Sequence, residues 1–258
     1  MSTPALPAAF LQRPIAHRAL HGQQEHCPEN SRAAIRAAVE AGYGIEIDLQ
    51  LSADGRAMVF HDEQLERLTD AAGPVRARTS AELEAIPLKN GDGECIPTFR
   101  EVLDIVAGRV ALLVEIKDQD GGMGPNVGPL EAAAVADLAG YDGPVALMSF
   151  NPHSIAEVAR LAPHLPRGLT TCAYDPQEWA PLAAEECDAL RAISDFDRVG
   201  ACFISHEARD ITRARVQALR ADGVPILSWT IRSPAEEAEV RRFADNVTFE
   251  NYLSALGA

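Results

Sequence analysis

The sequence predicts a (β/α)8 barrel in which one small insertion follows the second strand. Short apolar segments alternate with helix-like segments along nearly all of the 258 residues, which is typical of a parallel sheet covered by helices on both faces. About eight such units, in a chain of the length that α/β barrels commonly reach, favour a closed barrel over an open sheet. No G-x-G-x-x-G follows the first strand, so the pattern does not indicate a dinucleotide-binding fold. We expect one domain over residues 1–258.

The first half of the chain begins with "PIAH", which predicts a short buried strand. A helix follows in "NSRAAIRAAVEAG", with Asn30 or Ser31 as its N-cap and Gly42 as its end. "GIEIDLQL" and "AMVFHD" are β-rich and joined by the turn "SADG". Residues 62–97 then carry turn signals and the short helical pattern "SAELEAI". They form the predicted insertion.

The second half repeats the strand–helix alternation. The predicted strands are "VALLVEIKD", "PVALMSF", "RGLTTCAY", "ACFISH", "VPILSWTI" and "NVTFEN". Helical patterns separate most of them, including residues 130–138, 154–161, 213–221 and 235–243.

The charge and the cysteines narrow the function classes. With 23 basic and 38 acidic residues, the formal net charge of −15 disfavours binding to nucleic acid or to anionic membranes. Five scattered cysteines without a C-x-x-C pair favour a reducing compartment. The N-terminus lacks the pattern of a signal peptide, and no apolar run approaches 18 residues. We therefore predict a cytoplasmic protein with no stable membrane anchor, and its oligomeric state stays open.

Polar residues cluster where the predicted strands of the first half end. In a barrel, the carboxyl ends of the strands form the face that carries reacting groups. Two pairs, Glu46 with Asp48 and Glu115 with Lys117, are spaced two apart, so each pair shares one face of its strand. The full set is His17, Arg18, Glu46, Asp48, His61, Glu115 and Lys117.

These residue types suit one kind of chemistry. Three carboxylates forced together either take up a proton or bind a cation, and three oxygen ligands suit Ca²⁺ or Mg²⁺. Arginine and lysine beside them match a phosphate. Two histidines supply a general base and a general acid near neutral pH. The set therefore indicates metal-assisted cleavage of a phosphodiester.

Taken singly, each motif also has a structural interpretation. The His17–Arg18 pair fits a strand end that caps backbone groups, and Glu115 with Lys117 fits a simple ion pair. Glu46 and Asp48 fit the solvated face of an edge strand, but a parallel barrel strand has no such face. The ordered set favours the catalytic interpretation.

The ordered motifs "AHR…PENS…GIEIDLQLSADGRAMVFHDEQLERLT…GPV…IPTFREVL…LLVEIK" resemble those of the glycerophosphodiester phosphodiesterase family. The resemblance runs from about residue 15 to 117 and continues weakly in "SF" and "WTI". It implies a (β/α)8 barrel with an insertion after the second strand, which fits residues 62–97. It also implies hydrolysis of a glycerophosphodiester to glycerol 3-phosphate and an alcohol.

The resemblance assigns roles to individual residues. It implies that Glu46, Asp48 and Glu115 bind Ca²⁺ or Mg²⁺, that His17 and His61 are the general acid/base pair, and that Arg18 and Lys117 bind phosphate. Glu29 and Asn30 match the "PEN" element that shapes the site. We favour His17 as base and His61 as acid. Trp229, at the end of the seventh strand, is an apolar wall for the substrate or a core residue.

Three departures from the family concern the substrate more than the reaction. Ala19 stands where the family commonly has glycine, the loop over residues 19–27 is longer and carries two histidines, and "TFEN" replaces a Thr-Asp pair. We expect His21, His26, His206 and Glu250 in loops or on the rim. The alternatives are a phosphodiesterase acting on a lipid headgroup or sugar phosphodiester, and a non-catalytic barrel that binds a phosphodiester. The attacking oxygen is that of water or of the neighbouring glycerol hydroxyl.

Overall fold

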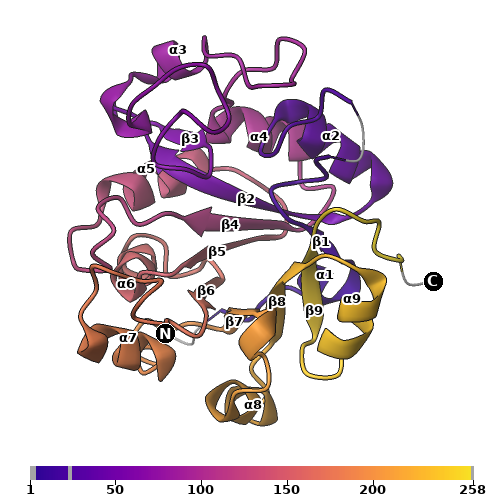
Figure 1. The fold of residues 1–258 in the computed structure, drawn as a ribbon, viewed down its shortest axis with the longest axis vertical. Coiled ribbons are helices and arrows are strands. Elements are labelled where there is room, and N and C mark those ends of the chain that lie inside the picture. The colour runs from indigo at the N-terminus through magenta and orange to yellow at the C-terminus, as the bar shows by residue number, and fades with distance from the viewer. Residues whose placement is uncertain (1–3, 23–24, 257–258) are drawn as a thin grey trace.

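A computed structural model describes residues 4–22 and 25–256, and a closed barrel of parallel strands lies at its centre (Figure 1). The ring closes because β1 pairs with β2 on one side and with β9 on the other. Its strands are β1 (Ile15–Ala16), β2 (Gly44–Leu51), β4 (Leu112–Ile116), β5 (Val145–Ser149), β6 (Arg167–Thr171), β7 (Phe203–Glu207), β8 (Ile226–Ile231) and β9 (Asn246–Phe249). β3 (Ala57–Val59) pairs antiparallel with the end of β2. The predicted (β/α)8 barrel is confirmed.

Helices surround the barrel wall, and local signals fix their ends (Figure 1). α2 begins where the Ser31 hydroxyl accepts a hydrogen bond from Ala34 N, and it ends at Gly42, whose φ of 78° suits glycine. The helices are α1 (Ala9–Gln12), α2 (Arg32–Ala41), α3 (Ser80–Leu83), α4 (Phe99–Val106), α5 (Pro129–Asp137), α6 (Pro152–Leu161), α7 (Ala184–Arg191), α8 (Ala214–Ala221) and α9 (Pro234–Val240), with 3-10 turns η1 (Val75–Ala77) and η2 (Ala208–Asp210). No helix of the described residues is long and apolar enough to cross a membrane.

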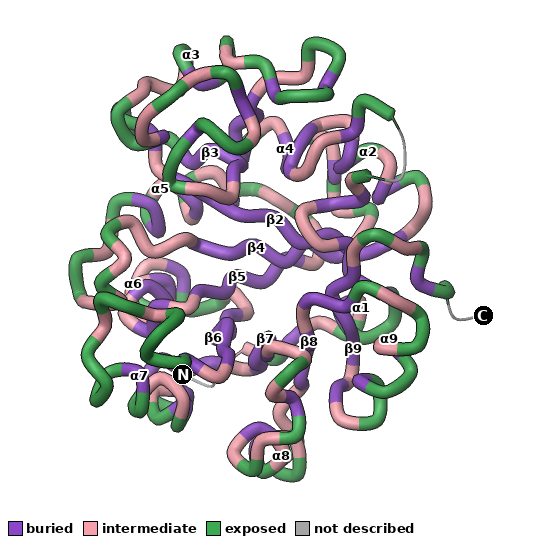
Figure 2. Tube along the Cα trace, viewed as in Figure 1, coloured by how far each residue is buried: buried purple, intermediate pink, exposed green. Residues whose placement is uncertain are grey.

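Two apolar layers support the barrel, one outside and one inside its wall. Outward-facing residues of β2, including Ile45 and Ile47, are buried against the helices. Inside, Phe203 and Leu227 pack with Phe10 of α1 at the end where the strands begin. Figure 2 shows the strands buried along most of their length, whereas exposed segments lie on the helices and loops. The opposite, carboxyl end of the barrel is therefore left for polar side chains.

Residues 62–97 pack as a small unit on the β3 side of the barrel (Figure 1). Their apolar side chains form a separate buried cluster with two residues of the β3 segment: Met58, Phe60, Leu65, Val75, Leu83, Leu88 and Ile96. Because β3 pairs with the end of β2, this cluster lies beside the carboxyl end of β2. The insertion boundaries and the single domain over residues 1–258 stay predictions.

One predicted rim residue lies elsewhere. His206 is in β7 and has no exposed surface. Its Nδ1 lies 2.8 Å from the Thr171 hydroxyl, and its Nε2 lies 3.2 Å from the Asp210 carbonyl. The prediction failed because β7 continues past His206 to Glu207, so the histidine is inside the strand rather than after it.

Candidate active site

Three carboxylates meet at the carboxyl end of the barrel. Glu46 and Asp48 lie in β2, and Glu115 of β4 is the direct neighbour of Asp48 in the sheet. One ligand oxygen from each lies within 4.8 Å of the other two, and all three residues are buried. Burying three like charges this closely is costly without a counter-charge. The donors are all oxygen, so the cluster fits a hard divalent cation such as Ca²⁺ or Mg²⁺.

Fixed cations partly neutralise this cluster. Lys117 Nζ lies 2.7 Å from Asp48 Oδ1 and 2.5 Å from Glu115 Oε1. Arg18 Nε lies 3.7 Å from Asp48 Oδ2, and Asn30 Nδ2 donates to the same oxygen at 2.9 Å. Both cations keep part of their surface facing the cavity, where they are available to the oxygens of a phosphate.

The carboxylates respond differently to burial. Burial opposes the charge on Asp48, but Lys117, His61 and Arg18 together hold the pKa of its carboxyl far below the ordinary value. For Glu46, burial raises the pKa well above the ordinary value, and the charges of Asp48 and Glu115 add to that effect. A cation bound beside Glu46 would favour the charged form of its carboxyl, which is the chemistry expected of a metal ligand.

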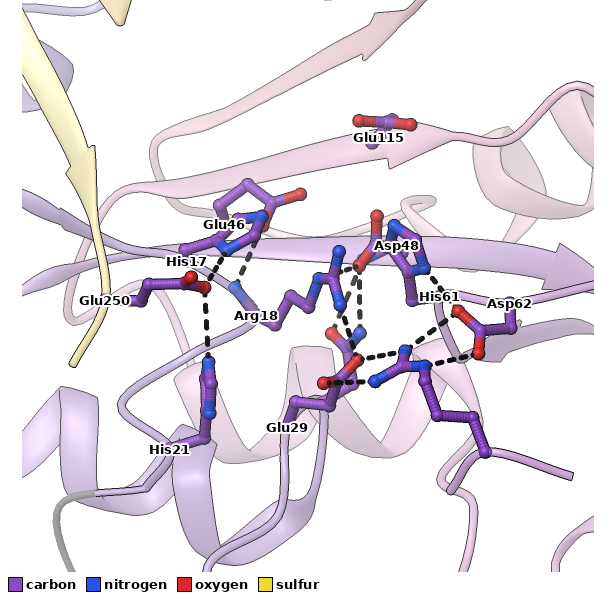
Figure 3. Close-up of polar contacts among 12 residues, drawn as sticks. His17, Arg18, His21, Glu29, Glu46, Asp48, His61, Asp62, Glu115 and Glu250 are labelled. Atoms are coloured by element: carbon purple, nitrogen blue, oxygen red, sulfur yellow. Dashed lines mark hydrogen bonds and ion pairs between the residues drawn. The ribbon is translucent and has the colours of Figure 1, made fainter. Parts of the chain in front are cut away.

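His17, which follows β1, is held by the carboxylate of Glu250, which directly follows β9 (Figure 3). Its Nδ1 lies 2.6 Å from Glu250 Oε2, and its Nε2 lies 4.0 Å from Glu46 Oε2. The other oxygen of Glu250 accepts a hydrogen bond from Arg232 Nε at 2.8 Å. Burial lowers the pKa of His17 although Glu250 raises it, and the bond to His17 helps lower the pKa of Glu250 to about 2.

His61 has the same type of support from the insertion. Its Nδ1 lies 2.6 Å from Asp62 Oδ1, and Arg67 Nε donates to Asp62 Oδ2 at 2.5 Å. Arg67 also binds both oxygens of Glu29 at 2.8 Å, and Glu29 in turn accepts from Arg18. A carboxylate on Nδ1 fixes the ring orientation and leaves Nε2 for the proton transfer.

These groups face one cavity of about 190 Å³. Trp229 and Phe150 form an apolar part of its wall, with ring centroids 5.6 Å apart in an edge-to-face arrangement. Trp229 Nε1 donates to the Ser205 carbonyl at 2.9 Å, which fixes the indole in that wall.

The structure brings most of the predicted residues to this cavity. Its lining includes His17, Arg18, Glu46, Asp48, His61, Glu115, Lys117 and Trp229. Glu29 and Asn30 lie behind Arg18 and Asp48 and hold them through the hydrogen bonds described above.

Sequence reasoning missed three supporting residues. Glu250 was assigned to the rim, whereas Arg67 and Arg232 were not singled out. The replacement of the family's Thr-Asp pair by "TFEN" was a signal for Glu250, because a carboxylate stands at the same strand end. For Arg67 and Arg232, no pattern in the chain points to a partner.

The fold and the site together define a barrel enzyme that cleaves phosphate esters. The chain belongs to the glycerophosphoryl diester phosphodiesterase family, since the model of that family matches residues 17–247. The predicted family and the prediction of an enzyme are confirmed.

Known proteins of this family resemble the chain over most of its length. A glycerophosphodiester phosphodiesterase of Caldanaerobacter subterraneus subsp. tengcongensis is 36% identical over 224 residues, which cover 84% of each chain. One from Bacillus subtilis is 25% identical over 256 residues, 92% of this chain and 83% of the relative. Among solved structures, a phosphodiesterase of Oleispira antarctica in complex with the product sn-glycerol-3-phosphate has a TM-score of 0.76 at 26% identity, and the match covers 95% of each chain.

Proposed function

We propose that the protein hydrolyses a glycerophosphodiester to sn-glycerol 3-phosphate and an alcohol. The observation that carries the proposal is the cavity in which two histidines, each with its Nδ1 2.6 Å from a carboxylate oxygen, face the same group of fixed cations and acids. The named activity of the relatives and the product bound to the Oleispira antarctica enzyme support this substrate class.

We assign the cation site to Glu46, Asp48 and Glu115, with Ca²⁺ or Mg²⁺ as the ion. When bound, such an ion neutralises charge on the phosphate oxygens and polarises the phosphorus centre. Arg18 and Lys117 hold the same phosphate from the protein side, because their cationic groups line the cavity beside the cluster.

His17 is assigned as the general base and His61 as the general acid. Burial lowers the pKa of His17, so at neutral pH its Nε2 is free to accept a proton from the attacking oxygen, which belongs to water or to the glycerol 2-hydroxyl. The charge of Glu250 then stabilises the imidazolium that forms. His61, supported by Asp62 and Arg67, delivers a proton to the leaving alkoxide.

Measurement of glycerol 3-phosphate released from glycerophosphocholine tests this function, with and without a chelator. We expect release in Ca²⁺ or Mg²⁺, loss of release after chelation, and recovery when the cation is restored. Soluble and lipid diesters assayed in parallel separate this activity from cleavage of a lipid headgroup or a sugar phosphodiester. Metal-dependent binding without turnover indicates the non-catalytic barrel instead.

A further inference from the structure

His21 is a half-buried histidine beside the proposed general base, and the proposed mechanism does not use it. It lies in the loop after β1, where the chain departs from the family pattern. Its Nε2 is buried and has no hydrogen-bond partner among the residues that the structure describes. That nitrogen points toward Glu250, and lies 3.8 Å from Glu250 Oε2 (Figure 3). An unpartnered buried nitrogen aimed at a carboxylate is costly unless something occupies the space between them.

Three candidate metal ligands of two types, two imidazoles and one carboxylate, converge at this point. One ligand atom each from His17, His21 and Glu250 lies within 4.8 Å of the other two. Glu250 Oε2 lies 2.6 Å from His17 Nδ1 and 3.8 Å from His21 Nε2. These distances bracket the separation of about 3.3 Å between ligands held tetrahedrally at about 2.0–2.1 Å from zinc. Each of the two pairs that include Glu250 therefore needs to shift by less than about 1 Å to bind one ion.

The chemistry of the two neighbouring groups differs. Glu46, Asp48 and Glu115 offer only oxygen, which suits Ca²⁺ and Mg²⁺. Two imidazoles and one glutamate form a ligand set that zinc prefers, with a position left for water. The second oxygen of Glu250 is already oriented by Arg232 Nε at 2.8 Å, which is the outer support that metal-binding carboxylates require.

We propose that His17, His21 and Glu250 form a second metal site, selective for a transition cation such as Zn²⁺, whose occupation inhibits the enzyme. The ion takes the lone pairs of His17 Nδ1, His21 Nε2 and a Glu250 oxygen. The single ring proton of neutral His17 is exchanged through solvent from Nδ1 to Nε2, so that no net proton is released and Nε2 no longer accepts one. The inhibition, but not the binding, rests on the proposed role of His17 as base.

The test compares the wild-type protein with His21→Phe, which keeps a ring of similar size and removes both nitrogens. The control is His164→Ala, because this exposed histidine lies between α6 and β6, at the other end of the barrel. Calorimetric titration with ZnCl₂ in saturating Mg²⁺ measures binding, and glycerol 3-phosphate release measures inhibition. We expect one zinc per wild-type chain, at least about tenfold weaker binding in His21→Phe, and equal turnover of all three proteins without zinc.

Each result decides between defined alternatives. If wild type and His21→Phe bind zinc with the same affinity, and a higher Mg²⁺ concentration weakens that binding, zinc is bound by the carboxylate cluster. This result overturns the second site. Absence of zinc binding to the wild-type protein also overturns it, whatever the variants do. If zinc binding requires His21 but does not change turnover, the second site stands and the proposed inhibition is refuted. The proposed role of His17 as general base is then refuted as well. His21→Ala replaces the phenylalanine variant if that variant does not fold.

Discussion

Replacement of Glu250 tests whether this carboxylate positions and charges the proposed base. Its contact with His17 is short, at 2.6 Å, and both side chains are largely shielded from solvent, at 14% and 12% exposed. A hydrogen bond to a charged group contributes about 1.5–3 kcal/mol. If the whole energy of this hydrogen bond stabilises the transition state, Glu250→Ala lowers turnover about 10- to 150-fold, because about 1.4 kcal/mol corresponds to a factor of ten in rate.

A graded series separates charge from geometry. Glutamine retains a hydrogen-bond acceptor but loses the charge, and charge-assisted bonds are roughly twice as strong as neutral ones. Glu250→Gln is therefore expected to lower turnover by about 4- to 13-fold. Glu250→Asp retains the charge one methylene further away and should restore part of the activity lost in the alanine variant.

The assay is glycerol 3-phosphate release at saturating substrate and cation, and as a function of pH. Glu250 raises the pKa of His17 against the effect of burial, so its removal should move the acid side of the pH profile to lower pH. Glu239→Gln is the matched control, because Glu239 lies exposed on α9 and pairs with the exposed Arg242 just after that helix. Turnover of Glu250→Ala within twofold of the wild type, with an unmoved profile, would refute the role given to Glu250.

Three further outcomes follow from the structure. His17→Ala and His61→Ala should each lower turnover about 10²- to 10⁴-fold; a variant with near wild-type turnover removes that histidine from the mechanism. Lys117→Ala leaves Asp48 buried without its closest cation, and urea unfolding should show a loss of about 3–5 kcal/mol, whereas the exposed Lys89→Ala should change stability little. Glu237 accepts hydrogen bonds from Tyr252, Ser254 and Arg241, and despite burial these bonds lower the pKa of its carboxyl. The stability that they add is present above about pH 4.5 and is lost at lower pH. Glu237→Gln should therefore lower the free energy of unfolding by about 1–3 kcal/mol at pH 7. A loss of the same size in acid would contradict the stabilising role given to the charged carboxylate.

The barrel could be predicted because its determinants are local. Apolar runs such as that of β4, and end signals such as Ser31 and Gly42, are read within a few residues of the chain. The spacing of Glu46 and Asp48 likewise fixes their shared face without knowledge of the fold.

Contacts between distant elements were not predictable in the same way. Glu250 reaches His17 only because β9 pairs with β1 and closes the ring, which brings together residues 233 positions apart. The sequence predicts His21 only as a loop or rim residue, since nothing near it in the chain reveals the carboxylate that follows the last strand. Arg67 links Glu29 to Asp62 through the folding of residues 62–97, for which the chain shows only turn signals.

The most direct test of the proposed function is the release of glycerol 3-phosphate from glycerophosphocholine by the purified, chelator-treated protein. We predict release that appears on addition of Ca²⁺ or Mg²⁺ and is abolished when Glu46, Asp48 or Glu115 is replaced by alanine. Failure to cleave any soluble, lipid or sugar diester in saturating Ca²⁺ and Mg²⁺ would contradict the proposed function.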